Sequence, residues 1–171
     1  MNAKRRIAEL ELLLRGGLAE QAAGRFEAAG AAYVKALALH PKCADALHLL
    51  GQVRHQQGRD AEALDLVRRA IGAAPPTAMY ANTQGVVLRA LGRRDDALAA
   101  FRRAISIDPR HAAARKNVAV ELARLEAGAD EIVQAFVAAS ALQPGDPECW
   151  LGLAQALLRA ERPAEAVTAA Q

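Results

Sequence analysis

Four prolines at a nearly constant interval constrain the fold of this chain more than any other feature. Pro41, Pro75 and Pro109 are 34 residues apart, and Pro144 follows after 35. Before each proline, a small residue is followed four positions later by an aromatic or branched residue and seven positions later by alanine, with Ile132 replacing the small residue once. The pattern reads Ala29, Tyr33, Ala36; Ala63, Val67, Ala70; Ala97, Phe101, Ala104; and Ile132, Phe136, Ala139. This regularity indicates a repeat protein.

Each repeat is predicted to be a pair of helices. Upstream of the proline pattern lies a second apolar pattern with helical spacing, such as Leu47, Leu50 and Gly51. The two patterns are separated by a glycine, at Gly24, Gly58 and Gly92. Glycine accepts the positive φ that commonly ends a helix, and proline prevents the second helix from continuing. Because one hairpin cannot bury its own apolar face, the repeats are expected to stack into a continuous core.

Composition agrees with close-packed helices. Of the 171 residues, 53% are hydrophobic but only 4% are aromatic, so the core must consist of Ala, Leu, Val and Ile. The 22 basic and 19 acidic residues give a net charge of +3, which describes a mixed surface and not a polybasic one. Cys43 and Cys149 are too few for a disulfide framework and lack the C-x-x-C spacing of a zinc or redox site.

The period of 34 with W-x2-L-G-x2-Y, then A-x3-F, then P resembles the tetratricopeptide repeat (TPR) family in its bacterial type. Trp150, Leu153 and Ala154 carry the first part of this motif. The resemblance implies an all-α fold, a right-handed superhelical solenoid. We expect an N-terminal extension (1–9) and repeats over 10–43, 44–77, 78–111, 112–146 and 147–171. The departures are Gly16-Gly17 in the first repeat, Gln84 in the third, and one extra residue near 125–130 in the fourth.

The two ends of the chain suggest its location and extent. The start resembles a signal peptide in its basic residues, but Glu9 and Glu11 interrupt the apolar run that such a peptide needs. No stretch approaches the ~20 apolar residues of a membrane span, so we expect a cytoplasmic protein without a membrane partner. Gln171 falls inside the second helix of the fifth repeat, which suggests a fragment of a longer protein. The alternative is a naturally short chain that frays or forms an oligomer through the exposed face of its last repeat.

Residues for catalysis are sparse. The two serines, Ser106 and Ser140, have no histidine nearby in sequence or repeat position, and a nucleophile without a base is only a hydroxyl. His48 and His55 are separated by about 10.5 Å along a helix, which is too far to share one ion as an i, i+4 pair does. We therefore predict no enzymatic activity, no cofactor and no metal site, and expect these histidines to be solvated or to line the groove.

The resemblance implies that the first helices line a concave groove and that set positions on them contact the ligand. The residues that we select as partner-binding are His48, Gln52, His55, Asn82, Arg89, Lys116, Arg124, Gln155 and Arg159, and the same positions include Asp45, Gln56, Met79, Val86, Val120 and Leu151. Their chemistry changes from amide and imidazole toward the N-terminus to cationic toward the C-terminus. An extended peptide or partner protein with an acidic group near the fourth repeat would suit this gradient.

Two specialised TPR functions can be compared with the sequence. The chaperone-binding members hold a terminal carboxylate with Lys and Asn, but Leu14 and Leu18 occupy those positions here. The O-linked N-acetylglucosamine transferases carry a ladder of asparagines, and the corresponding positions here are Arg15, Leu49, Thr83, Asn117 and Gly152. A single asparagine does not make that ladder.

A third function class is nucleic-acid binding. Arg68-Arg69 and Arg102-Arg103 occupy equal positions in neighbouring second helices and are expected to form a basic ridge on the convex side. Four arginines without an exposed aromatic platform for stacking make a weak footprint compared with dedicated binders, so we do not expect a nucleic-acid partner. The sequence thus predicts a non-catalytic protein-interaction scaffold. The alternative is the N-terminal regulatory or substrate-recognition region of a larger enzyme, such as a TPR-containing glycosyltransferase.

Overall fold

The computed structural model describes residues 3–169, and this part of the chain forms ten α-helices and no strand. The first and last predicted segments, 1–9 and 147–171, therefore lie partly outside the described residues. The helices are α1 (Ala3–Ala22), α2 (Phe26–Leu39), α3 (Ala44–Gln56), α4 (Asp60–Ala73), α5 (Ala78–Ala90), α6 (Arg94–Ile107), α7 (Ala112–Arg124), α8 (Ala129–Leu142), α9 (Pro147–Arg159) and α10 (Pro163–Ala169).

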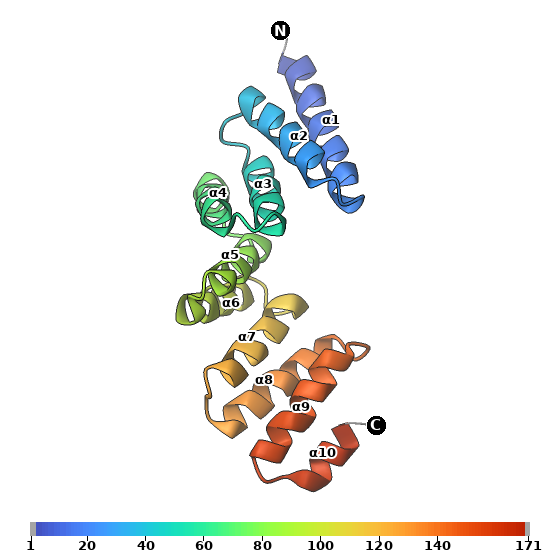
Figure 1. Ribbon diagram of the computed structural model, residues 1–171, viewed down its shortest axis with the longest axis vertical. Coiled ribbons are helices and arrows are strands. Elements are labelled where there is room, and N and C mark those ends of the chain that lie inside the picture. Colours follow the sequence, from blue (N-terminus) through green and yellow to red (C-terminus); the bar gives the residue numbers. More distant parts are fainter. Residues whose placement is uncertain (1–2, 170–171) are drawn as a thin grey trace.

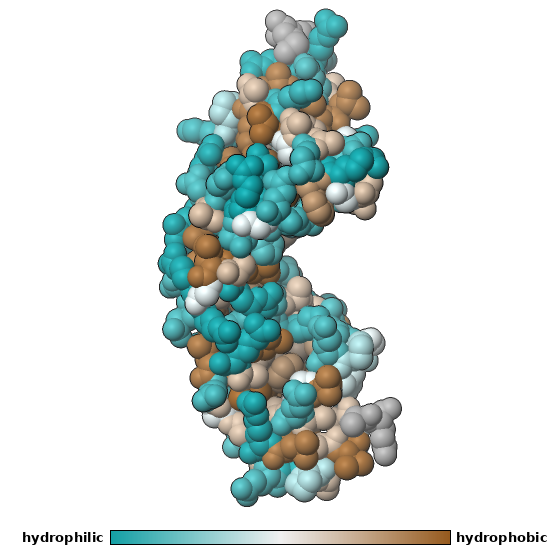
Figure 2. All heavy atoms as spheres, viewed as in Figure 1, coloured by the Kyte–Doolittle hydropathy of each residue, from teal (hydrophilic) through white to brown (hydrophobic). Residues whose placement is uncertain are grey.

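The helices stack in chain order into a curved solenoid, with the two ends of the chain at opposite ends of the long axis (Figure 1). Each helix packs mainly against the helix before it and the helix after it, and alternate helices α3, α5, α7 and α9 also touch one another. Figure 2 shows the same curvature in space-filling form, hollowed on the right between the upper and lower halves of the molecule. The predicted helical repeat solenoid is confirmed.

The turns follow the predicted use of glycine and proline. Gly24, Gly58 and Gly92 have φ values of 74°, 73° and 75°, the left-handed conformation in which glycine carries no Cβ penalty. The turn between α7 and α8 spans 125–128 and is one residue longer than the turn over 91–93 between α5 and α6. There, Glu126 takes the left-handed conformation with a φ of 54°.

The core is a continuous row of side chains from the predicted stripes. Tyr33 and Phe101 are fully buried, as are the alanines that flank them in their helices. Each ring lies against a glycine of the preceding helix: a Cβ added at Gly17 would lie 2.4 Å from the Tyr33 ring, and one added at Gly85 would lie 2.4 Å from the Phe101 ring. A larger residue at either glycine would overlap the ring unless the ring or the helix shifts.

Two further features bear on the predictions. Within residues 3–169, no helix is both long enough and apolar enough to cross a bilayer. Cys43 and Cys149 are free thiols, the first half-buried and the second buried.

Candidate functional site in the concave groove

A pocket of about 730 Å³ opens along three first helices, α5, α7 and α9. It contains five of the nine residues predicted to bind a partner, from three successive repeats. The lining residues are Arg89, Lys116, Asn117, Val120, Ala123, Arg124, Phe136, Glu148, Leu151, Gly152, Gln155 and Arg159. The structure thus brings the C-terminal, cationic half of the predicted set into one place, which we call the groove pocket.

Lys116 is neutralised by two carboxylates at the N-terminal end of α9. Its Nζ donates hydrogen bonds to Asp146 Oδ2 at 2.8 Å and to Glu148 Oε2 at 3.0 Å. The hydrogen bond to Asp146, and next the bond to Glu148, hold the pKa of Lys116 above its ordinary value. The hydrogen bond from Lys116 also holds the pKa of Asp146 below its ordinary value. Asp146 also caps the N-terminus of α9 by accepting from the Glu148 backbone N–H. Lys116 therefore ties α7 to α9 and offers little free charge to a ligand.

Arg89 is held by groups on three sides. Its Nη1 donates to Asn117 Oδ1 at 3.0 Å and lies 3.7 Å from Glu121 Oε1, while its guanidinium carbon lies 5.7 Å from the centre of the Phe101 ring. Glu121 is fully buried, and neither of its carboxylate oxygens has a hydrogen-bond partner among the described residues. The positive charge of Arg89 is thus partly compensated by the buried carboxyl group of Glu121, which does not itself line the pocket.

Arg124 and Arg159 are the cations of the groove pocket that keep their charge free. Both are exposed, and neither makes a hydrogen bond or an ion pair with any residue in 3–169. They occupy the last turns of α7 and α9, where the helix dipole favours positive charge. These two guanidinium groups are open to an anionic group in the pocket, and the exposed Gln155 also lines the pocket.

Apolar groups complete the lining. Val120 and Ala123 come from α7, Leu151 and Gly152 from α9, and the ring of Phe136 from α8. The Leu151 side chain is 61% exposed, which is high for a leucine and leaves it open to contact. The pocket therefore combines a cationic rim with an apolar surface, a composition common in sites that recognise a specific ligand.

The predicted residues of the N-terminal half of the groove do not line the groove pocket. For His48 the expectation of an accessible side chain is wrong. We expected a solvated or groove-lining side chain, but His48 is only 2% exposed and its Nε2 lies 2.9 Å from Thr83 Oγ1 on α5. Its ring also packs on Tyr80, with 4.7 Å between the ring centres. Burial lowers the pKa of His48 to about 4, against a smaller opposing effect of Asp45. A ligand cannot reach this side chain while the helices stay packed.

The other N-terminal residues lie outside the groove pocket. His55 Nδ1 pairs with Asp60 Oδ1 at 2.5 Å across the turn between α3 and α4, and Gln52 is half-buried. Asn82 accepts a hydrogen bond of 3.0 Å from Asn117 Nδ2, which links α5 to α7 beside the pocket. These three residues stay predictions as partner contacts.

Phe136, Gly152 and Glu148 line the pocket but were not among the residues that we selected. For Phe136 and Gly152 the sequence does contain a signal. The residue one period after Gly85 is Ala119 and not glycine, and a glycine occurs at position 152. Glu148 follows the helix start in the fifth repeat and has no such signal. Nothing in the repeat pattern distinguishes Glu121, which stands where Val87 stands one period earlier and Val53 two periods earlier.

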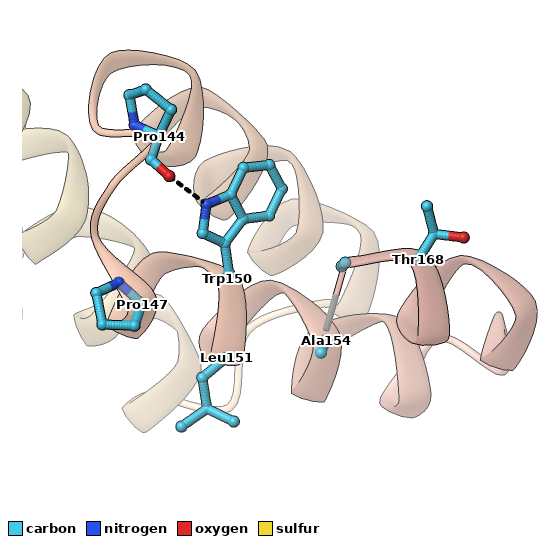
Figure 3. Close-up of a pocket in the computed structure, with 7 residues that line it drawn as sticks. Pro144, Pro147, Trp150, Leu151, Ala154 and Thr168 are labelled. Atoms are coloured by element: carbon cyan, nitrogen blue, oxygen red, sulfur yellow. Dashed lines mark hydrogen bonds between the residues drawn. The ribbon is translucent and has the colours of Figure 1, made fainter. Parts of the chain in front are cut away.

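Two other surfaces are weaker candidates. A pocket of about 470 Å³ between α9 and α10 is lined by Pro144, Pro147, Trp150, Leu151, Ala154, Thr168 and Ala169, and Figure 3 shows Trp150 Nε1 donating to the Pro144 carbonyl at 2.9 Å. It contains no charged group that would select a partner. On the predicted basic ridge, Arg69 pairs with Asp65 at 3.6 Å and Arg102 with Glu131 at 3.0 Å, which reduces the free charge.

Metal binding has no evident site in the part of the chain that the structure describes, since His, Cys, Asp and Glu side chains form no group of three suited to an ion.

Comparison with known proteins identifies the repeat. A family model described as tetratricopeptide repeat matches residues 14–78 and 133–171, and a second model of the same description matches residues 78–111. No curated protein matches. Among solved structures, MamA superposes with a TM-score of 0.80 at 20% identity, covering 90% of each chain. YrrB, described as a TPR protein with an unusual peptide-binding site, gives 0.73 at 24% identity over 92% of this chain and 80% of its own.

One similar structure is an enzyme. An O-GlcNAc transferase from Thermobaculum terrenum gives a TM-score of 0.78 at 26% identity, over 82% of this chain. The match covers only 27% of the enzyme.

Proposed function

Because this chain belongs to the tetratricopeptide repeat family, we propose that it is a non-catalytic scaffold that binds a partner protein in the groove pocket of α5, α7 and α9. TPR repeats support a role in protein interaction, and the peptide-binding description of YrrB supports a peptide as the bound element. The ligand would be an extended segment of the partner with an acidic group.

The observation that carries this proposal is the unequal compensation of the four cations. Lys116 and Arg89 face carboxyl groups of the chain itself, whereas Arg124 and Arg159 face none among the described residues. Two uncompensated guanidinium groups at the ends of neighbouring helices attract a carboxylate and hold it by charge-assisted hydrogen bonds. The acidic group is therefore expected at the end of the pocket formed by the last turns of α7 and α9.

A selection from a random twelve-residue peptide library tests this proposal. Peptides retained by the wild-type protein are expected to be enriched in Asp and Glu relative to the input library. The double variant Arg124→Glu with Arg159→Glu is expected to bind these peptides about tenfold more weakly. Each exposed ion pair with the peptide contributes little alone, but the variant loses two of them and its new carboxylates repel the acidic peptide. Binding is measured by fluorescence anisotropy at low and moderate salt.

The matched control is Arg68→Glu with Arg103→Glu on the second helices α4 and α6. These arginines are also exposed and make no ion pair within residues 3–169, so the change in net charge is the same. Equal losses in both double variants would mean that overall charge and not the groove determines binding. Selected peptides without acidic enrichment would also contradict the proposal.

A second candidate function rests on the resemblance to the glycosyltransferase. The likeness to part of this enzyme, at 26% identity over 82% of this chain, supports a regulatory or substrate-recognition region of a larger enzyme. Mass spectrometry of the protein purified from its natural source separates the two. A mass far above 18.1 kDa with a catalytic domain would favour the enzyme, and a mass near that value would favour the scaffold.

A further inference from the structure

Phe136 packs differently from the equivalent residues of the earlier repeats. Tyr33, Val67 and Phe101 occupy the same place in α2, α4 and α6, and each lies against a glycine of the first helix in its own repeat. Phe136 occupies that place in α8 but lies against Gly152 of the next repeat, where an added Cβ would be 2.2 Å from its ring. The ring therefore bridges two repeats.

Two local changes explain the new partner of the ring. The residue one period after Gly85 is Ala119, which has a Cβ where Gly85 leaves room for the Phe101 ring. The turn between α7 and α8 also has one residue more than the turn between the two helices of each other repeat. Gly152 offers the ring a place on α9 instead.

This shift puts an aromatic ring into the lining of the groove pocket. Phe136 is the one pocket residue that comes from a second helix; the others belong to α5, α7 and α9. Phe136 is 4% exposed, so the ring forms a floor and not a projecting anchor. Leu151 and Val120 stand beside this floor on the two neighbouring first helices, and Arg124 and Arg159 line the same pocket.

We propose that the groove pocket holds one large apolar side chain of the partner on Phe136, beside Leu151, with an acidic residue adjacent to it on Arg124 and Arg159. We call the surface of Val120, Phe136, Leu151 and Gly152 the apolar seat. This inference rests on the proposed function and adds the class of segment recognised. Its occupant is a partner segment with neighbouring apolar and acidic residues, chosen because the rim carries free positive charge.

Defined peptides test the seat. The probe is an acetylated and amidated peptide with one leucine followed by two aspartates in a glycine-serine background. One comparison peptide has alanine in place of leucine, and the other has asparagines in place of the aspartates. Wild-type protein is expected to bind the probe at least tenfold more tightly than the alanine peptide, because the seat removes the leucine side chain from water. It is also expected to bind the probe about tenfold more tightly than the asparagine peptide.

Two variants then remove the seat. Gly152→Ala places a methyl group where the Phe136 ring lies, and its control Gly85→Ala makes a similar overlap with Phe101 outside the pocket. The second variant, Leu151→Ser, changes an exposed side chain, so the protein is expected to fold normally. Its control is Val167→Ser, because Val167 is equally exposed, at 61%, and lies outside the pocket. The seat variants are expected to abolish the preference for leucine over alanine and keep the preference for aspartate. The controls are expected to keep both.

The outcomes separate this inference from the proposed function. If folded Leu151→Ser or Gly152→Ala keeps the full leucine preference, the seat is wrong while groove binding stands. If Arg124→Glu with Arg159→Glu keeps the aspartate preference, the proposed function is wrong. Absence of binding of the probe to the wild-type protein at millimolar concentration would overturn both.

Discussion

At the scale of single residues, His48 shows how a polar side chain becomes part of the core. The pattern of the repeat places it on the first helix, but Thr83 and Tyr80 of the next first helix approach it closely enough to exclude water. A buried imidazole is hydrogen-bonded and neutral, because charging it without solvent is costly. His48 therefore contributes to packing between repeats and not to the groove.

The lowered pKa of His48 predicts a pH-dependent stability. Between pH 6.5 and about 4 the unfolded chain binds a proton at this residue while the folded chain does not, so stability falls as the pH decreases through that window. From pH 7 to pH 5 the loss attributable to His48 is about 2 kcal/mol. Urea unfolding of wild type and His48→Gln at both pH values measures the difference. An equal pH dependence in the two proteins would show that His48 does not remain neutral when folded.

Sequence reasoning could identify the buried stripe at this scale but not every contact. Ala29, Tyr33 and Phe101 are buried as their spacing predicted. The burial of His48 depends on Thr83 and Tyr80, which lie a full repeat away, and the period does not report such pairs. Arg89 and Lys116 were predicted to lie in the groove from their repeat positions. Those positions do not show that carboxyl groups of the chain itself contact both side chains.

At the scale of helices, α7 differs from its equivalents by carrying a buried carboxyl group. Glu121 stands where α3 has Val53 and α5 has Val87, all three fully buried. A carboxyl group in such a place costs free energy unless it is paired and hydrogen-bonded. Among the residues that the structure describes, the Glu121 carboxylate has only the 3.7 Å contact with Arg89. The Glu121 carboxyl group thus occupies a core position that valine fills in α3 and α5.

Replacing this group is therefore expected to stabilise the stack. Glu121→Val should raise the free energy of unfolding by about 1–3 kcal/mol, because the apolar side chain restores the pattern and Arg89 remains accessible to water. Glu121→Gln keeps the shape and the unpaired polar atoms, so it is expected to give no such gain. Chemical denaturation of both variants provides the measurement. A destabilisation by Glu121→Val would mean that the contact with Arg89 outweighs the cost of burial.

The boundaries of the helices were the most predictable part of the structure, since glycine and proline fix them locally. What the pattern did not contain is the relation between α8 and its neighbours. The extra residue over 125–128 was visible in the sequence, but its effect on Phe136 depends on Ala119 and Gly152 together. Apolar periodicity defines which face of a helix is buried and leaves open which neighbouring helix covers it.

At the scale of the whole molecule, the groove pocket exists because repeats stack. Its lining comes from α5, α7, α8 and α9, so no single repeat contains the pocket. In a solenoid each repeat contacts chiefly the next one, and the curvature of the stack produces an extended concave surface. Arg124 and Arg159, the cations of the groove pocket that make no ion pair within residues 3–169, come from the fourth and fifth repeats.

An amide NMR titration of the ¹⁵N-labelled protein with the leucine–aspartate peptide tests most directly whether the groove pocket is the binding site. The largest chemical-shift changes are expected in α7 between Asn117 and Arg124 and in α9 between Leu151 and Arg159, with Phe136 also affected. Residues of the convex helices α4 and α6 should change little. Largest changes at Arg68 and Arg103, or confined to the pocket at Trp150 and Thr168, would contradict a concave site for an acidic and apolar segment.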